Sequence, residues 1–287
     1  MTAQVVERTA PAKTILCGEH SVVYGRPAIA VPVSTMRARA SVSPSPKGSG
    51  LIIKALDLGH ELVLRNARQD QPLARMAQLV LESLGSPEPD AVMTLSSDLP
   101  VASGMGSGTA ISVAAARALS AFLGSELPPE TVSALTYEVE KIHHGTPSGI
   151  DNTVIAFEQP VYFVRGSPPE LFRIHTPFHL LIANSGIAAS TRDSVAEVRH
   201  RWEAAPSYYG IIFDCIGAIA QAARAAVEQG ALQALGVLFN ENHELLARMG
   251  VSLYQLDRLT SAARAAGALG AKLTGSGQGG NIIALVV

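Results

Sequence analysis

The stretch Ser103-Gly104-Met105-Gly106-Ser107-Gly108 lies between a strand-like segment at residues 91–95 and an alanine-rich helical stretch at residues 109–123. Glycine allows the backbone to approach a ligand closely, and the free N–H groups at the start of a helix attract anions. A simple connection from a strand to a helix would need one glycine rather than three. The stretch therefore predicts a phosphate-binding turn. It is not the loop of the P-loop enzymes, because no Gly-Lys-Ser or Gly-Lys-Thr follows it.

A second glycine-rich stretch reads Lys272-Leu273-Thr274-Gly275-Ser276-Gly277-Gln278-Gly279-Gly280. It matches the dinucleotide-binding pattern Gly-x-Gly-x-x-Gly, but only seven residues follow Gly280. Seven residues cannot supply the helix, the next strand and the ribose-binding acid that a dinucleotide site requires. A plain turn would need fewer glycines, so we expect a turn that packs against a phosphate loop or a substrate.

Two acidic residues flank a turn in the middle of the sequence. Glu140 lies near the end of a predicted helix, and Asp151 follows the turn at residues 145–149. Two carboxylates that converge can share a magnesium ion, or divide into a metal ligand and a proton acceptor. The alternative is a solvated helix end and a helix N-cap, and the spacing alone leaves both interpretations open.

A lysine opens the apolar segment at residues 14–16, and a polar loop at residues 18–27 follows that segment. The loop includes Glu19 and His20. A charge at the start of a strand is often only a strand end in water, so Lys13 by itself decides nothing. Together the lysine and the loop contain polar side chains that folding alone does not require, so this segment is a candidate functional segment.

The composition describes a protein with a sizeable core and almost no net charge. Of 287 residues, 47% are hydrophobic and 16% are charged, and the net charge is -2. These values exclude a disordered protein, and they leave no basic field for a nucleic acid or an anionic membrane. Cys17 and Cys215 are too few for a disulfide framework or a four-cysteine zinc site.

The sequence shows no targeting or membrane segment. Residues 1–13 carry Glu7 and Arg8 and lack the apolar stretch of a signal peptide. No run of 18 or more apolar residues is present, so no transmembrane helix is expected. We therefore expect a cytoplasmic protein that acts on a small molecule.

Helical and strand-like segments are mixed without a strict alternation, which favours an α+β fold over a doubly wound sheet. The predicted strands are 14–16, 28–31, 37–42, 51–55, 91–95, 178–183, 271–273 and 281–287. The predicted helices are 72–84, 109–123, 128–144, 191–202, 211–229, 231–248 and 253–266. The irregular segment 166–176, with two prolines, is the candidate domain boundary.

Taken together, these segments resemble the GHMP family of small-molecule kinases, and within it the mevalonate kinases. The resemblance is carried by three motifs, at residues 11–33, 100–114 and 272–285. A fourth stretch, from His144 to Asn152, is similar to the mevalonate kinases in particular. The order of the four motifs makes the resemblance specific, although any one of them alone would be weak.

The resemblance implies a two-domain α+β fold. Residues 1–170 would form a domain like ribosomal protein S5 domain 2, and residues 171–287 a ferredoxin-like domain. It also implies ATP and Mg²⁺ as cofactors, and mevalonate as the substrate whose 5-hydroxyl receives the γ-phosphoryl group. No nucleic acid or membrane partner is expected, and a homodimer is left open.

The resemblance also implies a role for each matching residue. Asp151 matches the catalytic aspartate, Lys13 the lysine beside it, and Glu140 the magnesium-binding glutamate. The implied cofactor-binding residues are Ser103, Gly104, Met105, Gly106, Ser107, Gly108 and Thr109. The implied substrate-binding residues are Glu19, His20, Ser148, Gly149, Gly275 and Ser276. Ser107 and Thr109 are further candidates for holding the magnesium ion.

Two features depart from the family pattern. The second motif usually carries a serine that helps to hold magnesium, and here Gly108 occupies that position, followed by Thr109. The family usually continues with a helix and a strand beyond the last strand here, which ends at Val287. This predicts a trimmed sequence or a C-terminal domain with an open sheet edge.

Three alternatives to a mevalonate kinase are open. A kinase of another small alcohol would share the phosphate-binding residues, and only the stretch at residues 144–152 argues against it. A non-catalytic regulator on the same fold would keep the pocket without turnover, and Gly108 favours that idea. A decarboxylase is less well supported, because a lysine beside the aspartate fits a kinase.

Overall fold

The computed structural model describes residues 5–68, 70–99, 104–144 and 147–286. The chain forms two compact units that are interleaved along the sequence. The first unit comprises Met1–Ala12, Pro32–Pro100 and Gly106–Glu158. The second unit comprises Lys13–Val31, Val101–Met105 and Gln159–Val287. The domain boundary near residue 170 stays a prediction. The chain passes from one compact unit to the other at several earlier points, the last of them after Glu158.

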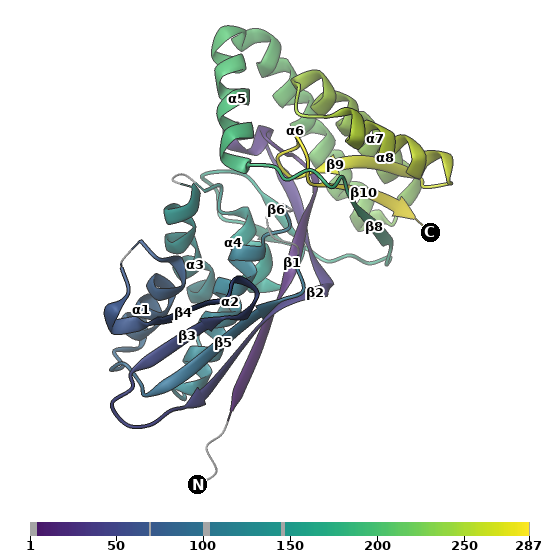
Figure 1. The fold of residues 1–287 in the computed structure, drawn as a ribbon. Helices are drawn as coiled ribbons and strands as arrows, with labels where there is room; N and C mark the ends of the chain where they lie inside the picture. Colours follow the sequence, from purple (N-terminus) through teal and green to yellow (C-terminus); the bar gives the residue numbers. More distant parts are fainter. Residues whose placement is uncertain (1–4, 69, 100–103, 145–146, 287) are drawn as a thin grey trace. The chain divides into compact units, whose positions relative to one another are not determined.

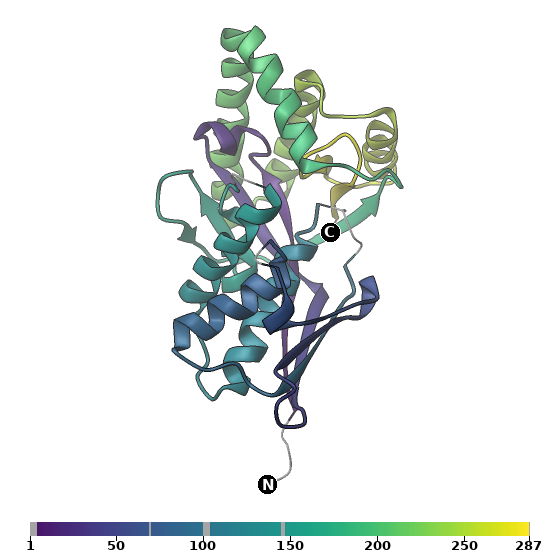
Figure 2. The ribbon, with the colours of Figure 1, turned by 60° about the vertical axis from the view of Figure 1, so that its left-hand side comes forward.

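The first unit is a sheet with helices packed against it (Figures 1 and 2). Its strands lie in the order β4 (His60–Val63), β3 (Leu51–Ala55), β5 (Ala91–Ser97) and β2 (Ala28–Pro44), and β1 (Val6–Cys17) pairs with β2. β3 and β5 are parallel, whereas the other pairs in this order are antiparallel. The helices are α1 (Pro72–Leu84), α2 (Ser107–Phe122), α3 (Pro129–His144) and α4 (Ile150–Phe157).

Local sequence explains why these elements form. In β3 the buried residues Leu51, Ile53 and Ala55 alternate with half-buried ones, which is the period of a strand with one face on the core. Helix α1 has Pro72 in its first turn and ends at Gly85, which adopts a left-handed conformation. The predictions for both segments are confirmed.

The second unit contains a three-stranded antiparallel sheet in the order β8 (His179–Asn184), β10 (Asn281–Val286) and β9 (Gly270–Thr274). The helices of this unit are α5 (Thr191–Ala204), α6 (Pro206–Gln229), α7 (Leu232–Met249) and α8 (Tyr254–Ala265). Helices α7 and α8 contact the sheet, and α6 packs on α7 (Figure 1). The first residues of β2 pair with β6 (Val161–Phe163), which pairs with β7 (Glu170–Leu171).

Within the described residues, α6 is the one helix that is long and apolar enough to cross a membrane by length and composition. Half of that stretch is buried inside the protein. Its buried residues Ile212, Phe213 and Ile216 belong to the core of the second unit. The helix therefore contributes one of its faces to the core of this unit.

Several elements differ from the sequence-based expectation. β1 begins at Val6, well before the predicted strand at 14–16, and the strands β4, β6 and β7 were not predicted. Two further differences concern β2 and α4. The separate strands predicted at 28–31 and 37–42 are one strand, β2, which runs through Pro32. Pro32 lies between the residues that pair with β6 and those that pair with β5, so neither ladder needs the N–H that proline lacks. Residues Ile150–Phe157, for which no element was predicted, form the helix α4.

An ionic network anchors the end of α4 in the first unit. Glu158 ends the helix with φ +51° and accepts hydrogen bonds from Arg37 at 3.0 and 2.9 Å. Arg117 donates to Glu158, to the carbonyl of Ala156 at 2.8 Å and to the carbonyl of Thr9 at 2.9 Å. The network therefore joins β1, β2 and α2 to the helix that carries Asp151.

We expect Glu158→Gln to lower the free energy of unfolding by about 2 kcal/mol, because the two guanidinium groups lose a half-buried charged acceptor. Urea unfolding monitored by circular dichroism measures the change. Glu82→Gln is the matched control, since its ion pair with Arg75 is largely exposed, and it should change stability by less than about 0.5 kcal/mol. Equal losses in the two variants would contradict the anchoring role.

Candidate functional site

The first glycine-rich turn leads directly into α2. Gly104 and Gly106 both have φ +75°, and Gly106 is the N-cap of the helix. Both glycines adopt a conformation that other residues rarely reach, so the turn depends on them. Ser107 is the first residue of α2, and its neighbours present N–H groups without intrahelical partners. Ser103 lies outside the described residues.

The turn is also tied to β1 within the second unit. The backbone N–H of Lys13 donates to the carbonyl of Met105 at 3.1 Å. Both residues are buried, Lys13 with 4% of its surface exposed and Met105 with 3%. The lysine is therefore not a strand end in water, which was the alternative interpretation of its position.

Two candidate metal ligands meet in the first unit. The Thr109 hydroxyl in the first turn of α2 donates a hydrogen bond of 2.9 Å to Oε1 of Glu140 on α3. Both side chains are almost completely buried. A buried carboxylate beside a hydroxyl is a set of hard oxygen donors, which is the ligand type that Mg²⁺ prefers. Gly108, the next residue toward the turn, is exposed.

Asp151 lies in the first turn of α4, whose N-cap is Gly149 with φ +90°. Ser148 Oγ accepts a hydrogen bond of 3.4 Å from the N–H of Ile150. Asn152 fixes the helix to α3 by donating to the Ser133 hydroxyl at 2.9 Å and to its carbonyl at 3.2 Å. The position of Asp151 is thus set by a short helix and not by a free loop.

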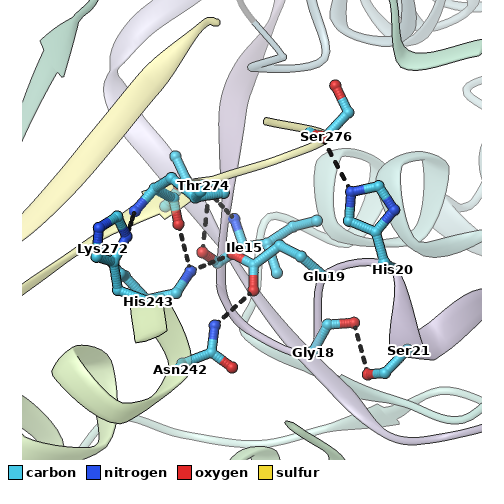
Figure 3. Close-up of polar contacts among 12 residues, drawn as sticks. Ile15, Gly18, Glu19, His20, Ser21, Asn242, His243, Lys272, Thr274 and Ser276 are labelled. Carbon is cyan, nitrogen blue, oxygen red and sulfur yellow. Dashed lines mark hydrogen bonds and ion pairs between the residues drawn. The ribbon is translucent and has the colours of Figure 1, made fainter. Parts of the chain in front are cut away.

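The end of β1 and the short helix η1 (Ser21–Tyr24) hold Glu19 and His20 in the second unit. Glu19 is 1% exposed and forms an ion pair with Lys272, and its Oε2 accepts a hydrogen bond of 3.0 Å from Asn242 (Figure 3). His20 Nε2 contacts the carbonyl of Ser276 at 2.9 Å. Burial lowers the pKa of the His20 imidazole below its usual range.

The second glycine-rich turn lies beside the first one inside the same unit. A Cβ placed on Gly275 would be 3.9 Å from the carbonyl oxygen of Gly104. A small cavity there is lined by Gly104, Ala189, Thr274, Ser276, Gly277, Gly279 and Gly280. The second glycine-rich turn therefore lies against Gly104 of the first one, and the phosphate-binding role of the first turn stays a prediction.

The structure thus brings together some of the predicted site residues within each unit. Glu140 contacts Thr109 in the first unit, and His20 contacts Ser276 in the second. Asp151 and Lys13 belong to different units, so the pairing that the resemblance implies for them stays a prediction.

Lys272, Asn242 and Thr274 have no role that follows from the sequence alone. Thr274 Oγ1 donates to the carbonyl of Ile15 at 3.0 Å and accepts from its N–H at 3.2 Å. One signal was present, since a lysine in the centre of an apolar strand is rare unless it is paired. The partner Glu19 is 253 residues away in sequence, so no local pattern could identify it.

Comparison with known proteins gives two family matches. The model described as GHMP kinases N terminal domain matches residues 71–159, and that described as GHMP kinases C terminal matches residues 223–286. A mevalonate kinase of Thermococcus sibiricus is 36% identical, with 96% of this chain and 88% of the relative covered. A mevalonate kinase of Pyrococcus horikoshii is 37% identical, with 96% and 87% covered.

Solved structures show the same fold. The L. major mevalonate kinase in complex with R-mevalonate has a TM-score of 0.83 and 30% identity, with 98% of this chain and 87% of that chain covered. The Methanococcus jannaschii mevalonate kinase has a TM-score of 0.86 and 26% identity, with 100% and 91% covered. By these matches over almost its whole length, the chain belongs to the GHMP kinase family.

Proposed function

We propose that this protein transfers the γ-phosphoryl group of ATP to the 5-hydroxyl group of mevalonate, a step toward isoprenoid precursors. The observation that carries the proposal is the identity of 36% with an archaeal mevalonate kinase over 96% of the chain. The relative whose structure holds R-mevalonate adds the same fold at a TM-score of 0.83. Use of ATP follows from membership of a kinase family.

The glycine-rich turn at residues 104–109 binds the phosphates of ATP in this proposal. Its two glycines with positive φ and the first N–H groups of α2 form an anion-binding end of a helix. Phosphoryl transfer needs little covalent chemistry from a protein, and depends on positioning and on stabilisation of negative charge.

Glu140 and Thr109 are the residues that would hold Mg²⁺, and their buried carboxylate and hydroxyl oxygens fit that ion. Ser107 at the start of α2 is a further candidate. Mg²⁺ commonly takes one or two protein ligands beside phosphate oxygens and waters, so Gly108 in place of serine is compatible with activity. When bound, the ion would offset negative charge on the transferred phosphoryl group.

Asp151 accepts the proton of the attacking hydroxyl group in the proposed reaction, and Lys13 stabilises the negative charge that develops. The anchored position of Asp151 on α4 suits a group that must orient a hydroxyl. The buried position of Lys13 limits its exposure to water, which strengthens its electrostatic effect.

A kinase of another small alcohol remains the second candidate, because the phosphate-binding residues are common to the family. A cytoplasmic location and a homodimer are further proposals. Light scattering of the purified protein measures its mass in solution and tests the homodimer.

An assay of ADP release with four alcohols tests the proposed function directly. We expect turnover with mevalonate to exceed turnover with phosphomevalonate, homoserine and galactose by at least about 100-fold, because specificity reflects differences in transition-state binding. A preference for another alcohol would support the second candidate. Absence of transfer to all four would support a non-catalytic regulator.

We expect Asp151→Asn to keep ATP binding and to lose about 10²–10⁴ in kcat, because the amide keeps the size of the side chain but cannot accept the proton. Steady-state kinetics and ATP titration by calorimetry measure the two effects. The neighbouring change Asn152→Ser is a control for the packing of α4. Turnover near that of the wild type in Asp151→Asn would remove the aspartate from the reaction.

We expect Glu140→Gln to raise the Mg²⁺ concentration required for half-maximal turnover by about tenfold or more, because an amide is a weaker ligand than a carboxylate. Gly108→Ser should fold normally and lower the Mg²⁺ requirement, since a Cβ at this position has no described atom within 4 Å. Magnesium titrations of turnover compare these variants with the wild type. Superimposable curves for Glu140→Gln and the wild type would show that Glu140 is not a ligand.

A further inference from the structure

Alternate residues of β9 and of the following turn hold the segment at residues 15–20 of the second unit (Figure 3). The contacts are those of Lys272 Nζ with Glu19 Oε1, of Thr274 Oγ1 with the backbone of Ile15, and of the Ser276 carbonyl with His20 Nε2. Lys272 and Thr274 lie two residues apart on β9, which is the period at which side chains of a strand return to the same face, whereas Ser276 in the turn makes its contact through its backbone carbonyl. The segment is therefore held at three successive points.

The first of these points is an ion pair without access to solvent. Lys272 is 0% exposed and Glu19 is 1% exposed. Burial of two charges is unfavourable unless each charge is paired and hydrogen-bonded. Lys272 Nζ also donates to the carbonyl of Leu273 at 2.6 Å, so the arrangement meets that requirement.

Asn242 on α7 is the second hydrogen-bond partner of the Glu19 carboxylate. Its Nδ2 donates to Glu19 Oε2 at 3.0 Å, and the whole residue is buried. A carboxylate only accepts hydrogen bonds, so the amide nitrogen must face Glu19. Both oxygens of Glu19 are thus occupied by Lys272 and Asn242, and the side chain fixes its own backbone in place.

The residue next to Glu19 has an unusual backbone conformation. His20 has φ 58° and ψ -47°, a combination that residues other than glycine rarely adopt. Gly18, two residues earlier, approaches β2 so closely that a Cβ on it would lie 2.4 Å from the Cα of Ala28. A strained residue persists only where its surroundings determine it, and such residues concentrate at functional sites.

The contact with Ser276 fixes the proton on the ring of His20. A carbonyl oxygen only accepts, so Nε2 carries the proton and donates it. Because burial lowers the pKa of His20, the ring is neutral near pH 7, and Nδ1 keeps a free electron pair. The imidazole can therefore accept a hydrogen bond at Nδ1 from a hydroxyl group.

We propose that Lys272, Glu19 and Asn242 are positioning residues for the alcohol substrate, and that they hold His20 so that its Nδ1 accepts a hydrogen bond from a substrate hydroxyl. The inference rests on the proposed function and on the substrate-binding role that the resemblance implies for His20. Glu19 then acts through His20, and the buried lysine acts through Glu19.

Two asparagines of α7 provide a matched pair of variants. Asn242→Ala removes the contact with Glu19, whereas Asn240→Ala removes a contact with the N–H of Ala271 on β9. We expect Asn242→Ala to raise the KM for mevalonate about tenfold, because the hydrogen bond between His20 and the substrate hydroxyl is then misplaced. The KM for ATP should change less than about twofold. Asn240→Ala should leave both KM values unchanged, and thermal unfolding of both variants confirms that they fold.

A double-mutant cycle tests whether the network acts through the histidine. We expect His20→Ala to raise the KM for mevalonate about tenfold or more. Adding Asn242→Ala to His20→Ala should then change the KM by less than about twofold, because residues that act through one another are not additive. Additive effects in the double variant would overturn the inference.

The tautomer of His20 gives a readout that does not depend on activity. Ring ¹⁵N chemical shifts, assigned by their loss in His20→Ala, should show the Nε2–H form in the wild type and in Asn240→Ala. We expect a mixture of tautomers in Asn242→Ala, because the imidazole is then held less firmly on Ser276.

The outcomes separate the two levels of the proposal. A raised KM in His20→Ala with a normal KM in Asn242→Ala overturns the positioning role and leaves the proposed function intact. A normal KM in His20→Ala overturns the substrate contact itself. If the wild type does not phosphorylate mevalonate, the proposed function fails, and unchanged ring shifts in Asn242→Ala then overturn the positioning role as well.

Discussion

Two strands serve both compact units, and this continuity constrains the whole structure. β1 leaves the first unit after Ala12, and β2 leaves the second unit after Val31. Side chains alternate strictly along a strand, so a shift of one residue would turn every side chain of β1 to the opposite face in both units. The side chain of Thr9, whose Oγ1 accepts a hydrogen bond of 2.8 Å from Arg37, and that of Thr14, whose Oγ1 contacts Thr274 Oγ1 at 3.0 Å, are thus set by one register.

Those parts of the candidate site that depend on local sequence could be predicted from the sequence. The glycines at 104 and 106 and the alanine-rich helix after them predict the turn that the structure contains. Helical periodicity also identified the stretches that carry Thr109 and Glu140. It could not predict that these two side chains meet, because periodicity identifies the buried face of a helix but not the helix that covers it.

The remaining features depend on non-local contacts or on weak local signals. Helix α4 has only eight residues and begins after Gly149 and Pro147, so the residues before it indicate a turn, and its stability comes from contacts such as that of Asn152 with Ser133. Lys272 has a charged side chain of the kind that usually lies on the surface, but it is completely buried in the core. Only the fold, which brings Glu19 to it, makes that burial acceptable.

The interleaved units also affect how the chain folds during synthesis. Thr14 and Thr274, which bond to each other, are 260 residues apart, and a ribosome that adds about 5–20 residues per second separates their appearance by roughly 13–50 s. During that interval the apolar part of β1 from Ile15 to Cys17 has no partner from β9 or β10. Contacts of such long range slow folding and expose strands to other chains. A slower translation rate would therefore lengthen the time during which this strand segment lacks its partners in β9 and β10.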